Sequence, residues 1–77
     1  MEIEHSAYWK GKRKYRPDIE DYMICYAVQN SNILRDRTWP DLFNAIARLP
    51  FNGRNLKVVY RRKGKNKIEV VTSYWID

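Results

Sequence analysis

Two runs rich in β-branched and aromatic residues, joined by a short polar turn, are the feature that most constrains the fold of this chain. The runs are NLKVVYR (residues 55–61) and KIEVVTSYWI (residues 67–76), and the turn between them contains Gly64. Residues of this kind favour extended strands, and a short glycine-containing turn joins strands that run antiparallel. The sequence therefore predicts a β-hairpin over residues 55–76.

Strict alternation along the two runs predicts which side chains share a face of the hairpin. The expected core face carries Leu56, Val58, Tyr60, Ile68, Val70, Thr72 and Tyr74. The opposite face carries Lys57, Val59, Arg61, Glu69, Val71, Ser73 and Trp75. This second set is too apolar for a simply solvated surface and too basic for a simply buried one, so we expect it to bind something.

Four segments precede the hairpin. Residues 3–16 place His5, Trp9 and Arg13 on one side of a helix that Gly11 weakens. A second helix is expected from about Ile19 to Asn30, with Asp18 as its cap. Residues 32–37 favour a short strand. Residues 41–50 fit both a helix and a strand, and their local pattern slightly favours the helix.

Length and composition predict one folded domain over residues 1–77. A hydrophobic content of 44% with eleven aromatic residues exceeds that of disordered chains. Cys25 is the only cysteine, and its apolar neighbours predict a buried thiol. The chain has no apolar stretch of about 20 residues and no signal-peptide pattern, so we expect a cytoplasmic protein with no membrane partner.

Charge makes nucleic acid the leading class of partner, ahead of acidic proteins and anionic membranes. The net charge is +6, and both ends of the chain are basic while residues 17–53 are mildly acidic. The hairpin stretch 56–71 alone has six positive charges and one negative charge. Its tip charges can simply solubilise a turn and protect a sheet edge from aggregation. Lys57 and Arg61 lie within a strand and are harder to explain in that way.

Several kinds of site are excluded by the sequence. One histidine and one cysteine cannot form a structural zinc site, so we predict no metal. Phosphate-binding glycine motifs are absent, no motif supports a serine hydrolase triad, and we predict no cofactor.

RNA binding is the chemistry that the remaining residues favour. Cations that neutralise phosphates and aromatic rings that stack on bases are both present. The candidates from the sheet for binding phosphate or stacking on bases are Arg48, Arg54, Lys57, Arg61, Arg62 and Trp75, with Arg13 nearby. Cleavage would also need a proton-transfer group, and His5 is the one side chain whose ordinary pKa suits that role near neutrality.

The order of the segments EHSAYWKGKR, PDIEDYMICYAVQNS, ILRDR and GRNLKVVYRRKGKNKIEVVTSYW resembles a family of small prokaryotic domains. That family is similar in turn to the RelE and BrnT toxins, which are small ribonucleases of toxin–antitoxin modules. The resemblance implies an α+β fold of the RelE/barnase type, with two N-terminal helices followed by an antiparallel sheet of three to four strands. It therefore favours a strand over residues 41–50.

The resemblance also implies site residues. It adds Thr72 and Tyr74 to the RNA site, although alternation places both on the expected core face. The family's first helix carries an arginine shortly after the histidine, whereas YWKGKRK is aromatic and lysine-rich. The implied catalytic residues are His5, Arg61 and Tyr74.

The resulting expectation is an RNA-binding, toxin-like protein that cleaves RNA without a metal. The alternative is a non-catalytic module that binds nucleic acid or protein. In that case Val59, Val71 and Trp75 would dock an antitoxin or a second copy of the chain as a homodimer. The sequence leaves open the activity, any role of the ribosome, the antitoxin and the oligomeric state.

Overall fold

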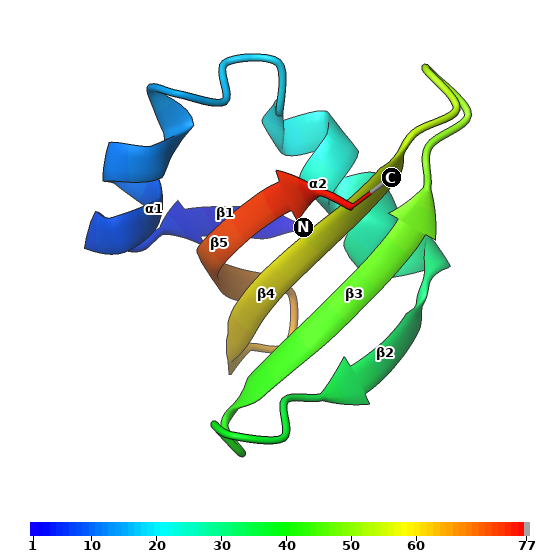
Figure 1. Cartoon of the computed structure of the whole chain (residues 1–77). Helices are drawn as coiled ribbons and strands as arrows, with labels where there is room; N and C mark the ends of the chain where they lie inside the picture. The colour runs from blue at the N-terminus through cyan, green and yellow to red at the C-terminus, as the bar shows by residue number, and fades with distance from the viewer. Residues whose placement is uncertain (77) are drawn as a thin grey trace.

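Five strands form one mixed sheet, and two short helices pack against it (Figure 1). The structure is a computed structural model and describes residues 1–76. The elements follow the order β1 (Glu2–His5), α1 (Ala7–Arg13), α2 (Asp21–Asn30), β2 (Asn32–Arg35), β3 (Leu42–Arg48), β4 (Asn55–Gly64) and β5 (Lys67–Trp75). The strand order across the sheet is β1-β5-β4-β3-β2. Within the described residues, neither helix is long and apolar enough to cross a membrane.

The predicted fold, with two N-terminal helices followed by three or four antiparallel strands, is wrong in its element order and sheet type. The protein is an α+β fold, but strand β1 precedes both helices and pairs in parallel with β5. β1 escaped sequence analysis because it has only four residues and pairs with a strand more than 60 residues away. Ser6 ends β1 and starts α1, since its Oγ accepts a hydrogen bond from the Trp9 N–H at 3.1 Å.

The second helix begins slightly later than predicted. α2 starts at Asp21 rather than Ile19, and Asp18 does not cap it. Asp18 instead accepts a hydrogen bond from Trp75 Nε1 at 2.9 Å. The helix buries Met23, Ile24, Ala27 and Val28 in the core. Its apolar residues therefore lie on the face that packs on the sheet.

Residues 42–48 form strand β3, although their local pattern slightly favours a helix. β3 lies between β2 and β4 and pairs with both in antiparallel register. Ala45 and Ala47 are buried in the core that α2 covers, and such small side chains let the helix approach the sheet closely. Pairing with a strand on each edge stabilises the extended conformation more than the local pattern favours a helix.

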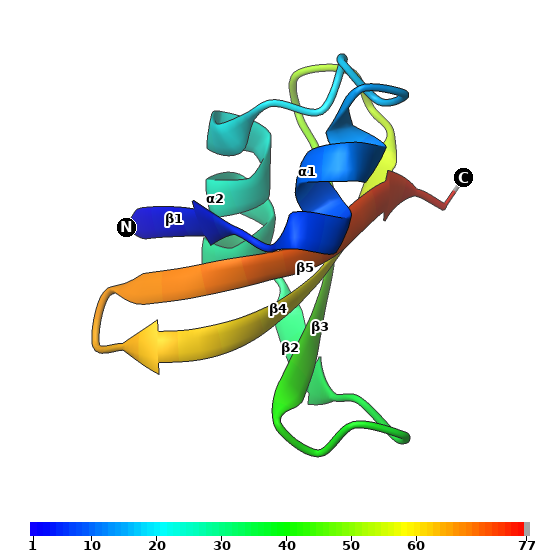
Figure 2. The same cartoon turned by 90° about the vertical axis from the view of Figure 1, so that its left-hand side faces the viewer.

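Helices and sheet form two layers with one face of the sheet left uncovered. Figure 2 shows both helices on one side of β4 and β5. Trp9 of α1 is completely buried in the same cluster as Ile24 of α2. We call the helix side of the sheet the covered face, and the opposite side, which faces the viewer in Figure 1, the open face.

The hairpin follows the predicted alternation only as far as Val70. The residues predicted for the core and found buried are Leu56, Val58, Tyr60, Ile68 and Val70. The register then shifts, because Tyr60 pairs with Val70 while Val59 pairs with Thr72. Val71 is thus the extra residue of a β-bulge.

The bulge exchanges the faces of the residues that follow it. Thr72 and Tyr74, predicted for the core, pair with Val59 and Lys57 on the open face. Ser73, predicted for the opposite face, is completely buried, and its hydroxyl donates to the Lys57 carbonyl oxygen at 2.9 Å. The bulge is held by Ser6, whose hydroxyl donates to the Val71 carbonyl oxygen at 3.1 Å.

Candidate nucleic-acid interface

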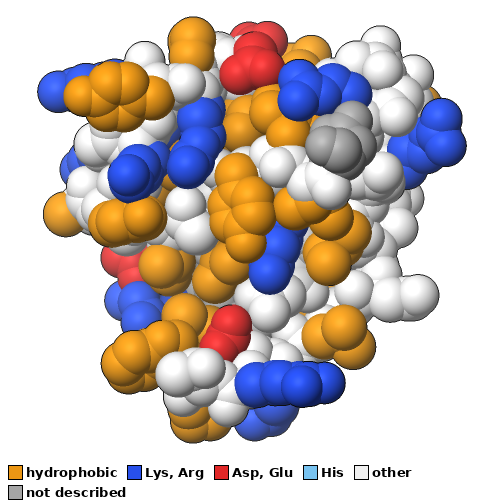
Figure 3. Space-filling view, in the orientation of Figure 1, with side chains coloured by type: hydrophobic (Ala, Val, Ile, Leu, Met, Phe, Trp, Pro, Cys, Tyr) orange, Lys and Arg blue, Asp and Glu red, His pale blue; other side chains and the backbone are white. Residues whose placement is uncertain are grey.

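The open face combines polar, basic and apolar side chains. Lys57 of β4 lies between Tyr74 of β5 and Ile46 of β3 in the register of the sheet. Figure 3 shows hydrophobic side chains across this face with separate lysine and arginine side chains among them. No helix packs here, so these side chains can contact a partner directly.

Tyr74 lies between two cations. The Lys57 Nζ is 5.7 Å from the centre of the Tyr74 ring, and the Arg16 Cζ is 5.8 Å from it. Both distances are near the outer limit of about 6 Å for cation–π contacts. Both charged groups therefore sit beside the ring with N–H groups left for an anion.

Arg16 is positioned by the edge of strand β5. β1 pairs with β5 only from Lys67 to Val70, which leaves the later residues of that edge without a neighbouring strand. The Arg16 Nη1 donates to the Ser73 carbonyl oxygen at 3.2 Å on this free edge. The same side chain thus satisfies a backbone acceptor and places its charge beside Tyr74.

A second basic and aromatic surface continues over α1. Tyr8 and Tyr15 are 59% and 83% exposed, and the Lys12 Nζ is 5.5 Å from the centre of the Tyr8 ring. With Gly11 and Lys14 they line a shallow hollow of about 440 Å³. In Figure 3, blue and orange side chains over α1 lie next to the open face.

Most of the basic residues form no ion pair within 4 Å among residues 1–76. Within residues 1–76, ion pairs shorter than 4 Å involve four of the fifteen lysines and arginines, namely Arg13, Arg54, Arg61 and Lys67. The other eleven are Lys10, Lys12, Lys14, Arg16, Arg35, Arg37, Arg48, Lys57, Arg62, Lys63 and Lys65. The excess positive charge is therefore concentrated on groups that can still bind phosphate.

Arg61, predicted as a catalytic and phosphate-binding residue, is already paired with two carboxylates. Its Nε donates to Asp41 at 2.9 Å and its Nη1 donates to Glu69 at 2.6 Å. These hydrogen bonds raise the pKa of Arg61, and the bond from Arg61 lowers the pKa of Asp41. A phosphate would have to displace both carboxylates, so the geometry favours a structural role for this arginine.

His5 lies on the other side of the sheet from Arg61 and Tyr74. It pairs with buried Val70 on the covered face, and its Nε2 is 3.4 Å from the Asp21 carboxylate. The same carboxylate accepts a hydrogen bond from Arg13 at 3.4 Å. These contacts join β1, α1 and α2. The three predicted catalytic residues therefore do not form one site.

The other residues predicted to bind RNA or phosphate are distributed over the molecule. Trp75 lies on the covered side with Arg54, whose Cζ is 4.2 Å from the ring centre, and both contact Asp18. The Arg62 Cζ is 4.8 Å from the centre of the Phe43 ring, also on the covered side. Arg48 is exposed at the end of β3. Lys57 and Thr72 remain as predicted residues that lie with Tyr74.

Arg16 is the site residue that sequence analysis missed. It follows the first helix and precedes Pro17, with no pattern that marks it for binding. Its position beside Tyr74 depends on the free edge of β5 and on the bulge at Val71, and neither was predicted.

Searches for known sites and relatives give no further assignment. Among residues 1–76, no group of three histidine, cysteine or acidic side chains is placed to hold a metal ion. Comparisons with protein families, with curated proteins and with solved structures return no match. The resemblance to RelE and BrnT toxins therefore remains a prediction from the sequence.

Proposed function

We propose that this protein binds single-stranded RNA on its open face, without cleaving it. The observation that carries the proposal is the placement of Tyr74 between Lys57 and Arg16, two cations that form no ion pair within 4 Å among the described residues. A base would stack against the tyrosine while its flanking phosphates contact the two cations.

Single-stranded nucleic acid suits this surface better than a duplex. Bases in a duplex are already stacked on one another and do not offer a free ring to Tyr74. The site also lies on an open sheet, and no helix projects from it to enter a major groove. Stacking of one base on an aromatic side chain contributes about 1–3 kcal/mol, measured by alanine substitution.

Binding without cleavage is supported by the positions of His5 and Arg61. The histidine lies on the covered face beside Asp21, and the arginine is held by Asp41 and Glu69. Neither is placed to transfer a proton or to stabilise charge at a phosphate bound beside Tyr74. The antitoxin, the ribosome and the homodimer stay predictions from the sequence.

Fluorescence anisotropy with a labelled single-stranded RNA of about 12 nucleotides tests the proposal, because OB-fold domains that bind single strands contact about 4–16 nucleotides each. Tyr74→Ala should weaken binding about tenfold or more. Tyr74→Phe, which keeps the ring, should bind within about twofold of the unchanged protein, since stacking needs only the aromatic face. Phe51→Ala is a matched control, because it removes an exposed ring beside Tyr22 and Tyr26 of α2.

Two outcomes would contradict the proposal. One is equal affinity for the unchanged protein and Tyr74→Ala. The other is RNA cleavage that the unchanged protein performs and His5→Ala abolishes, which would instead favour the endoribonuclease.

A further inference from the structure

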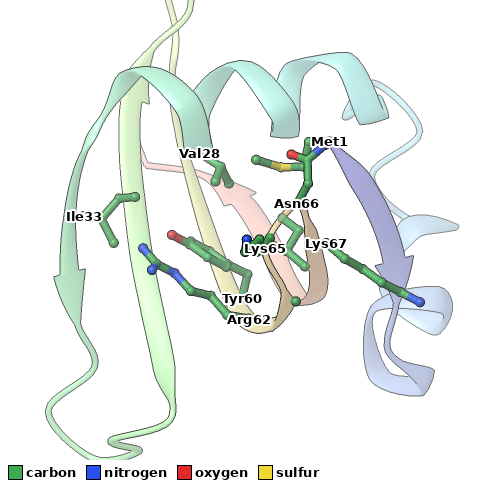
Figure 4. A pocket seen from close by; sticks show the side chains of 10 residues that line it. Met1, Val28, Ile33, Tyr60, Arg62, Lys65, Asn66 and Lys67 are labelled. Atoms are coloured by element: carbon green, nitrogen blue, oxygen red, sulfur yellow. The ribbon is translucent and has the colours of Figure 1, made fainter.

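A separate hollow lies on the covered face, between the end of the β4–β5 hairpin and the C-terminal end of α2 (Figure 4). Its volume is about 320 Å³, at the lower end of the range of about 300–1,000 Å³ for small-molecule pockets. The sheet separates it from Tyr74, so it is independent of the proposed RNA site.

The interior of this hollow is apolar on several sides. Val28 of α2, Ile33 of β2 and Ile68 of β5 contribute aliphatic side chains to its lining. Tyr60 contributes an aromatic ring, which stacks on Phe43 with ring centres 5.8 Å apart. A short hydrocarbon body would find apolar contacts here.

The Tyr60 hydroxyl is an unusual polar group in this environment. Tyr60 is only 1% exposed, and within the described residues its hydroxyl has no hydrogen-bond partner. Buried polar groups normally have partners, because losing contact with water without a replacement destabilises the folded state. The hydroxyl therefore has a hydrogen left to donate, and a ligand in the hollow reaches it when the side chains that cover the oxygen move aside.

Arg62 supplies a charge next to this hydroxyl. Its guanidinium and the Tyr60 ring both contact the same Phe43 ring, with the Arg62 Cζ 4.8 Å from its centre. Figure 4 shows both polar ends pointing toward the side where Ile33 lies. Among residues 1–76, the Arg62 side chain makes no ion pair and no hydrogen bond, whereas Lys67 at the rim is paired with Glu4 at 2.7 Å.

We propose that this hollow binds a small carboxylate with a short apolar body. The carboxylate would accept hydrogen bonds from the Tyr60 hydroxyl and from the forked guanidinium of Arg62. Its hydrocarbon part would lie against Val28, Ile33 and Ile68. A molecule with several phosphates fits less well, because only Arg62 and Lys65 among the lining cations lack a carboxylate partner.

An NMR titration with sodium octanoate tests this proposal. The amide signals of Val28, Ile33 and Ile68 should shift in a saturable way up to about 10 mM, since a ligand of this size binds in the millimolar to micromolar range. Tyr60→Phe and Arg62→Gln should each weaken octanoate binding about fivefold or more. Lys63→Gln is the matched control, because it removes a positive charge from the same hairpin at an exposed residue outside the hollow.

Two further probes distinguish the contribution of the hydrocarbon body from that of the carboxylate. Octanol, which keeps the hydrocarbon body, and inorganic phosphate, which keeps only the charge, should each bind about tenfold more weakly than octanoate. Tyr60→Phe should fold normally, because it removes only an unpaired hydroxyl, and Arg62→Gln changes a solvent-exposed residue. The proposal is overturned if the three amides do not shift, if octanol binds as well as octanoate, or if neither variant weakens binding.

Discussion

Lys57 and Tyr74 are direct cross-strand partners on the open face, with the lysine Nζ 5.7 Å from the centre of the tyrosine ring. Without the bulge at Val71, strict alternation would turn Tyr74 toward the helices and away from this lysine. The proposed RNA site therefore depends on one extra residue in β5, and the contacts that hold the bulge also maintain the site.

Two serines with covered hydroxyl groups test the hydrogen bond of Ser73, which lies beside the bulge. The Ser73 hydroxyl donates to the Lys57 carbonyl oxygen, whereas the buried Ser31 hydroxyl has no partner among the described residues. Ser73→Ala should lower the free energy of unfolding by about 1–2 kcal/mol, and Ser31→Ala should change it by less than about 0.5 kcal/mol. Urea denaturation of both variants measures the difference. Equal effects would show that the Ser73 hydrogen bond contributes nothing.

Arg61 and Lys57 should respond differently to the same substitution. Lys57→Gln should weaken RNA binding and reduce its dependence on salt between about 50 and 200 mM, because about one phosphate contact is lost. Arg61→Gln should lower the temperature of thermal unfolding, since Arg61 connects Asp41 with Glu69, and should leave RNA affinity within about twofold. If Arg61→Gln weakens RNA binding more than Lys57→Gln does, Arg61 contacts the RNA and the proposed site is wrong.

Protonation of Asp36 should account for part of the loss of stability of the fold in acid. Its carboxylate accepts hydrogen bonds from the backbone N–H groups of Trp39 and Thr38 and from the Asn44 side chain. The bond from Trp39, followed by that from Thr38, lowers the pKa of Asp36 below its ordinary value. Its stabilising contribution is therefore complete above the unfolded pKa of about 3.9 and is lost as the pH falls through the lower folded pKa.

Thermal unfolding of Asp36→Asn across pH measures this contribution. The variant should unfold at a lower temperature than the unchanged protein near pH 6, because a neutral amide accepts weaker hydrogen bonds than a carboxylate. The gap should close as the pH falls through the lowered pKa of Asp36, because the carboxylate then becomes protonated. A gap that stays constant over this range would show that ionisation of Asp36 does not stabilise the fold.

The sequence predicts the hairpin and its inward residues correctly as far as Val70, since β-branched residues alternate there with polar ones. It could not place the bulge, because Val71, Thr72 and Ser73 are all compatible with an extended strand in either register. β1 was missed for a different reason, since its four residues become a strand only by pairing with β5. In β3, pairing on both edges overrides the small helical preference of residues 41–50.

The sequence named only some of the residues that surround Tyr74. Lys57 and Thr72 were named and lie beside Tyr74, but Thr72 and Tyr74 were named from a family resemblance rather than from their strand positions. His5, Arg13, Arg54 and Trp75 have polar partners that only the folded chain brings together. Local sequence does not reveal which cations will be neutralised by distant carboxylates.

The most direct test of the central claim is an NMR map of the protein with a single-stranded RNA of about 12 nucleotides. The account predicts the largest amide and side-chain shifts at Lys57, Thr72 and Tyr74, with Arg16 at the margin and no shift at His5 or Asp21. Shifts centred on His5 and Asp21, or confined to the hairpin tip at Lys63 and Lys65, would contradict it.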